Sequence, residues 1–125
     1  MYSVAAEGVE WDWFASDSAG RIAFLSSGGS GQVPPPLLAQ EGIIEEFMTL
    51  AQVYSDNNAW QAAAAYGLYA YDVDANGGPF SRLAVPETPK AVGDLPERFR
   101  TLVSRVVLVG RFDQLATIRC EQFRY

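Results

Sequence analysis

The sequence predicts an α+β domain: a largely antiparallel sheet built from hairpins, with two main helices packed on one face. Pairs of segments with strand-like patterns are separated by turn residues, as in hairpins. Two segments with apolar residues at helical spacing lie between those pairs. The chain of 125 residues has the size of one domain, so we expect residues 1–125 to form a single domain.

The first hairpin is predicted in the first quarter of the chain. Trp11 and Trp13 alternate with Glu10 and Asp12, which places the two aromatic residues on one face of a strand. Residues 16–20 have the composition of a turn, and residues 22–25 form the predicted return strand. A glycine-rich loop at 28–31 and the prolines at 34–36 then lead toward a helix.

Two helices are predicted from apolar periodicity. The clearer one covers residues 37–54. Its apolar positions are Ile43, Ile44, Phe47, Leu50, Ala51 and Tyr54, and its polar positions include Glu41, Glu45 and Glu46. The second begins near Asp94, which with Glu97 resembles a capping box, and continues to about residue 106. Residues 59–65 are ambiguous, and we expect a short helical turn there.

The remaining segments are predicted to be strands. Asn76-Gly77 is a strong hairpin signal between strands at 68–73 and 80–85. Residues 107–112 and 117–123 would close the sheet as two further strands.

The residues for common catalytic and metal sites are absent from the sequence. It contains no histidine, and its one cysteine, Cys120, excludes an internal disulfide and a four-cysteine zinc site. The 28–31 loop lacks the complete pattern of a dinucleotide or Walker A loop. Residues 72–77 match the first half of a calcium loop, but Leu83 stands where the bidentate glutamate is required. We therefore expect no enzyme, no cofactor and no metal, although weak calcium binding at 72–76 stays open.

The charge of the chain is negative and uneven. The net charge is −6, which disfavours binding to nucleic acid. Residues 1–80 hold ten of the fifteen acidic residues and one of the nine basic residues. If the fold gathers those acids on one face, they would steer a basic partner toward it. No transmembrane segment or secretory signal is expected, so we predict a cytoplasmic protein without membrane contact.

Residues 11–29 resemble the opening of a group of small, mostly uncharacterised bacterial proteins. That group shares a Trp-Phe-x-x-Asp-x-x-Gly-x-Ile-Ala-x-Phe hairpin followed by a glycine-containing loop and prolines. Residues 82–86 and 94–96 are also similar to it. The shared motifs are turns, caps and core positions and carry no catalytic residue. Small acidic proteins of this sort are often immunity proteins, so the resemblance implies, by analogy, a role in neutralising a toxin.

The preferred hypothesis is a non-enzymatic protein-binding module that engages a basic partner, such as a toxin, through an acidic, aromatic-rich surface. The candidate partner-binding residues are Glu10, Asp12, Trp13, Asp17, Asp72 and Asp74. An alternative is a small-molecule-binding or enzymatic domain that uses the 28–31 loop and nearby carboxylates. A homodimer formed through an exposed strand at 117–123 is a third possibility.

Overall fold

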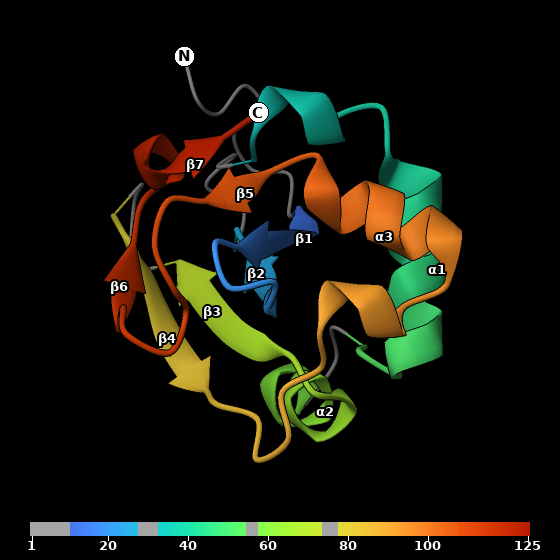
Figure 1. The fold of residues 1–125 in the computed structure, drawn as a ribbon, viewed down its shortest axis with the longest axis horizontal. Coiled ribbons are helices and arrows are strands. Elements are labelled where there is room, and N and C mark those ends of the chain that lie inside the picture. Colours follow the sequence, from blue (N-terminus) through green and yellow to red (C-terminus); the bar gives the residue numbers. More distant parts are fainter. Residues whose placement is uncertain (1–10, 28–32, 55–57, 74–77) are drawn as a thin grey trace.

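The computed structural model describes residues 11–27, 33–54, 58–73 and 78–125, and it has an α+β fold (Figure 1). The strands are β1 (Asp12–Asp17), β2 (Ile22–Ser26), β3 (Tyr69–Val73), β4 (Phe80–Ala84), β5 (Val107–Leu108), β6 (Thr117–Ile118) and β7 (Phe123–Arg124). The α-helices are α1 (Glu41–Ala51), α2 (Ala59–Tyr66) and α3 (Glu97–Ser104). Short 3₁₀ turns occupy Pro35–Leu37, Val92–Asp94 and Cys120–Gln122.

The sheet is mixed, which corrects the prediction of a largely antiparallel one. Its order is β6-β4-β3-β2-β1-β5-β7. The two predicted hairpins, β1–β2 and β3–β4, are present and antiparallel. However, two pairs of strands are parallel: β2 with β3, and β1 with β5. The chain between β2 and β3 includes α1 and α2, and such a long crossover can return it to the sheet in its original direction.

The C-terminal segment forms both edges of the sheet. One strand was predicted over residues 117–123, but the 3₁₀ turn Cys120–Gln122 divides this segment. Its first half, β6, pairs with β4, while β7 pairs with β5 at the opposite edge. Two strands so close in the chain can occupy opposite edges only if the sheet curls, and Figure 1 shows that curl on the left of the molecule.

Phe47 of α1 joins the three helices to the sheet. Its ring lies 4.4 Å from that of Phe14 in β1 and stacks on Phe99 of α3 at 4.9 Å, measured between centroids. Tyr66 of α2 meets the same ring edge-on at 6.2 Å. Phe47 itself has no exposed surface. The helices therefore share one aromatic cluster, on the face of β1 that carries Phe14.

A second aromatic group fills the inside of the curl. Trp13 makes edge-to-face contacts with Phe80 of β4 at 5.7 Å and with Phe123 of β7 at 5.4 Å. The ring of Phe112 lies 5.7 Å from that of Tyr71 in β3. The hydroxyl of Tyr71 donates to the carbonyl oxygen of Leu115 at 2.6 Å. It also lies 3.1 Å from the carbonyl oxygen of Phe112. The segment after β5 is thereby fixed across the inner face of the sheet.

The helices differ in extent from those predicted. The 37–54 helix is shorter: a 3₁₀ turn ends at Leu37, and α1 begins only at Glu41. Residues 59–65, which were ambiguous, form a true helix, α2. The carboxylate of Asp94 does accept a capping hydrogen bond, from the amide of Ala91, but it caps a 3₁₀ turn, and α3 starts after Pro96.

Within the described ranges, no helix is long and apolar enough to cross a membrane. The longest, α1, has 11 residues, compared with the roughly 20 residues that a membrane-spanning helix needs.

Replacing Tyr71 with Phe is expected to lower the free energy of unfolding near neutral pH by about 1–2 kcal/mol, because the carbonyl of Leu115 loses a buried donor. Burial raises the pKa of Tyr71 from 10.0 to about 12, against a smaller lowering effect of Arg82. Since the folded pKa is the higher one, the neutral hydroxyl stabilises the fold fully below pH 10, and this contribution is lost as the pH rises toward 12.

The measurement is urea unfolding of both proteins at several pH values from neutral to strongly alkaline. Burial also raises the pKa of the Cys120 thiol to about 12, so only the difference between the two proteins isolates Tyr71. That difference should shrink as the pH rises above 10. A difference that stays constant with pH would show that the Tyr71 hydroxyl is not held neutral by the fold.

Candidate functional site

The four predicted partner-binding residues that the structure describes do not form one exposed surface. Glu10 and Asp74 lie outside the described residues. Trp13 and Asp17 are buried, with exposed fractions of 0% and 4%. Asp12 and Asp72 are half-buried and stand near one end of the sheet.

Asp17 has a structural role and is almost completely buried, so the structure gives no support to its predicted role as a contact for a partner. Its Oδ1 accepts hydrogen bonds from the amides of Ala19 and Arg21, both at 2.9 Å. Its Oδ2 accepts one from the amide of Phe112 at 2.8 Å. The carboxylate therefore shapes the β1–β2 turn and also holds the segment after β5. A buried carboxylate needs such donors, because desolvation without them is costly.

Trp13 is likewise a core residue with no exposed surface, so the structure gives no support to its predicted role as a partner-binding residue. The alternation that placed it on one strand face is real, but both faces of β1 are covered. From Trp13 to Asp17 every residue of the strand is buried. The helices cover one face and the curl of the sheet encloses the other, so the ring of Trp13 offers no area for binding.

Asp12 and Asp72 belong to a polar row across the sheet. Asp12 is paired with Ser26 of β2, and Ser26 is paired in turn with Asp72 of β3. The row continues through Ser81 of β4 to Thr117 of β6. Because neighbouring strands are about 4.8 Å apart, the backbones of the two aspartates are separated by ~10 Å. One oxygen of Asp72 also accepts the amide of Val73 at 3.0 Å.

No reactive or metal-binding cluster is found in the parts of the chain that the structure describes. Within them, no three Cys, Asp or Glu residues gather as they would around a metal ion. Cys120 is 2% exposed, and burial raises the pKa of its thiol to about 12. A thiol of this kind is a poor nucleophile at neutral pH. Most of the segment that matches half of a calcium loop, from Asp74 to Gly77, lies outside the described residues.

Helix α1 and the residues just after it expose acidic and large apolar side chains, a combination that the sequence prediction missed. Glu41, Glu45 and Glu46 are exposed on this helix. Leu50 and Tyr54, which were expected to face the core, are 43% and 54% exposed. Glutamates at helical spacing were visible in the sequence but are common on any solvated face. The deciding feature, two large apolar side chains left in water, depends on how the helix is rotated against the sheet.

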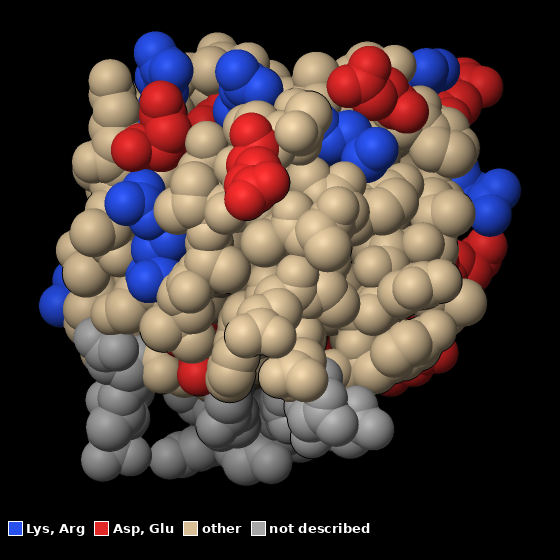
Figure 2. Space-filling view, turned by 90° about the horizontal axis from the view of Figure 1, so that it is seen from below, with Lys and Arg blue, Asp and Glu red and all other residues tan. Residues whose placement is uncertain are grey.

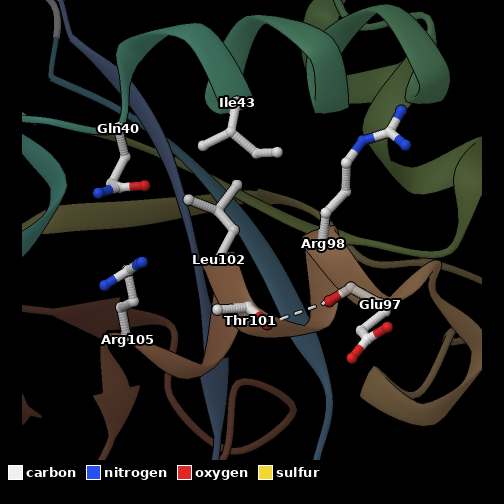
Figure 3. A pocket seen from close by; sticks show the side chains of 7 residues that line it. All are labelled: Gln40, Ile43, Glu97, Arg98, Thr101, Leu102 and Arg105. Carbon is white, nitrogen blue, oxygen red and sulfur yellow. Dashed lines mark hydrogen bonds between the residues drawn. The ribbon is translucent and has the colours of Figure 1, made fainter.

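A basic helix runs beside this acidic one. The exposed residues of α3 include Arg98, Arg100 and, at its C-terminal end, Arg105. Arg98 forms an ion pair with Glu46 across the two helices, with 3.3 Å between Nε and Oε1. A pocket of about 410 Å³ lies between α1 and α3, with Ile43 in its wall (Figure 3).

The surface around α2 differs from both, because α2 contains no charged residue. Figure 2 shows this side of the molecule, with few charged side chains in its middle and more along its upper edge. The described acids of residues 1–80 are divided between buried, half-buried and exposed positions. Their exposed members lie on α1, whereas Asp17 is buried.

Comparisons with protein-family models, curated proteins and solved structures gave no match. The resemblance of the first hairpin to a bacterial group stays a prediction. In this chain the matching run extends from Trp13 to Ala23, and Phe24 follows Ala23 directly. Function is therefore inferred from the geometry of the described residues.

Replacing Asp17 with Asn is expected to lower the free energy of unfolding by about 2–4 kcal/mol, because the neutral amide weakens three hydrogen bonds and turns an NH₂ group toward an N–H donor. Asp113→Asn is the matched control, since it disrupts only an exposed ion pair with Arg111 and should cost less than ~1 kcal/mol. Chemical denaturation measures both. Equal losses in the two variants would contradict the structural role of Asp17.

Proposed function

We propose that this protein is a non-enzymatic binding module of the bacterial immunity type, which engages a basic protein partner, such as a toxin, through the outer side of α1. The observation that carries the proposal is the exposure of Leu50, one turn after Glu46, and of Tyr54, on and just after a helix that also exposes Glu41 and Glu45. The proposal keeps the predicted chemistry, an acidic surface with an aromatic anchor, but assigns it to different residues.

The glutamates supply the electrostatic part. Glu41 and Glu45 are four residues apart and lie on the same side of α1. Neither forms an ion pair with another described residue, whereas Glu46 is engaged by Arg98. Two unpaired carboxylates in one turn repel each other weakly, and a cationic group placed between them would relieve that repulsion. Such charges raise the rate of encounter with a basic protein.

The exposed apolar residues supply the anchor. Leu50 lies four residues after Glu46, so the two are neighbours on the helix surface. Tyr54 follows shortly after the end of α1 and is more than half exposed. An exposed Tyr can bury its ring against a partner and can also contact a Lys or Arg side chain through its face.

The test is capture of partners from a lysate of the source cell, first at low and then at moderate salt, followed by affinity measurements on the purified partner. Glu41→Gln/Glu45→Gln should bind about tenfold more weakly at low salt, mainly through slower association. Tyr54→Ala should weaken binding to a similar degree, mainly through faster dissociation. The matched control is Glu87→Gln/Glu121→Gln, which removes the same charge from exposed positions outside α1.

The control double variant should bind like the unmodified protein. Equal weakening by both double variants would show a general charge effect and would contradict a site on α1. Recovery of no protein at low salt would also contradict the proposal.

One observation favours the alternative of a small-molecule or enzymatic site. The strand register places Asp12 and Asp72 on either side of Ser26, in the strand that leads toward the 28–31 loop. This alternative predicts that the double variant Asp12→Asn/Asp72→Asn loses a thermal shift produced by a metabolite, while the variants on α1 keep it.

A further inference from the structure

The pocket between α1 and α3 has an apolar floor. Ile43 of α1 and Leu102 of α3 face each other in its middle (Figure 3). Leu102 is 1% exposed, so the floor is continuous with the core. Phe47 and Phe99 stack between the same two helices and close the gap further along. A ligand that fills this space would cover the partly exposed side chain of Ile43, which favours an apolar body.

The polar groups at one end of the pocket include the donors of a guanidinium and of a side-chain amide, whose oxygen is an acceptor. Figure 3 shows the guanidinium of Arg105 and the amide of Gln40 directed toward each other across this end. Neither side chain forms a hydrogen bond or ion pair with another described residue. The first-turn amides of α1 begin at the same place, and no side chain caps them. This end of the pocket therefore favours a negative charge.

The other polar residues of the pocket do not oppose an anion. The carboxylate of Glu97 is turned away from the floor, as Figure 3 shows. The hydroxyl of Thr101 donates to the backbone carbonyl of Glu97 at 3.2 Å. At the far end Arg98 forms its ion pair with Glu46, so its charge is balanced there and Arg105 is the cation of the pocket without an ion pair to a described residue.

From these features we infer that the pocket binds a small organic carboxylate with an apolar body. The carboxylate accepts hydrogen bonds from Arg105 and Gln40, and the carbon chain lies over Ile43 and Leu102. The volume of about 410 Å³ falls in the range of small-molecule sites in proteins. This site goes beyond the proposed function, because it requires neither the partner nor the exposed glutamates Glu41 and Glu45.

Three probe molecules separate the two parts of this recognition. Hexanoate has both the charge and the apolar body, hexanamide has the body alone, and acetate has the charge alone. Each is titrated into the ¹⁵N-labelled protein, and backbone amide shifts are followed at 40–43 and 101–105. Hexanoate should produce saturable shifts at these residues, and both other probes should bind at least about tenfold more weakly.

Variants test the residues. Arg105→Gln should weaken hexanoate binding about tenfold, as expected from losing a charged hydrogen bond. The control is Arg119→Gln. This variant removes an exposed arginine that does not line the pocket, so it should leave hexanoate binding unchanged. The ¹⁵N spectrum of each variant also reports whether that variant is folded.

Several results would overturn the inference. Shifts that rise linearly without saturation, equal binding of hexanamide, or an unchanged affinity in Arg105→Gln would each exclude a carboxylate site here. Since Glu41 and Glu45 do not take part, failure of this test leaves the partner-binding proposal intact, and the reverse also holds.

Discussion

The carboxylate of Asp17 connects parts of the chain that the sheet alone does not hold together. One of its oxygens accepts hydrogen bonds from two amides of the β1–β2 turn, and the other accepts one from the amide of Phe112. Phe112 belongs to the segment that Tyr71 and Arg82 also fix, through hydrogen bonds to backbone carbonyls. Because the carboxylate is almost completely buried, each missing donor would leave a charge without compensation. The position of the segment after β5 therefore depends on a residue near the start of the chain.

That segment leads into the two strands that form the sheet edges. The 3₁₀ turn between β6 and β7 separates them, so that one pairs with β4 and the other with β5. The resulting curl encloses Trp13 between Phe80 and Phe123. On the other side of β1, Phe47 of α1 contacts Phe14 of β1, Tyr66 of α2 and Phe99 of α3, so all three helices share one aromatic cluster. Burial of β1 on both faces thus follows from the curl and from the helix layer together.

Local parts of this fold could be predicted from the sequence, and long-range parts could not. The β1–β2 and β3–β4 hairpins and the helix around Phe47 depend on alternation and helical spacing within a short window. The parallel pairing of β1 with β5, and the division of residues 117–123 between two edges, depend on contacts between distant residues. Dependence on distant contacts also explains why the candidate site residues could not be predicted from the sequence. Asp17 has the composition of a turn residue, and its bond to Phe112, 95 positions away, leaves no local pattern. Leu50 and Tyr54 match an apolar helix face, and only the packing of α1 shows that they are exposed.

Residues that maintain the fold differ from those that are exposed for binding, and Asp17 is the clearest case of the first kind. Amide hydrogen exchange tests this structural role directly, because the carboxylate of Asp17 accepts hydrogen bonds from the amides of Ala19, Arg21 and Phe112. We expect all three amides to be protected in the native protein, and we expect Asp17→Asn to accelerate their exchange together. Fast exchange of the Phe112 amide in the unmodified protein, or acceleration of the turn amides alone, would contradict this structural role.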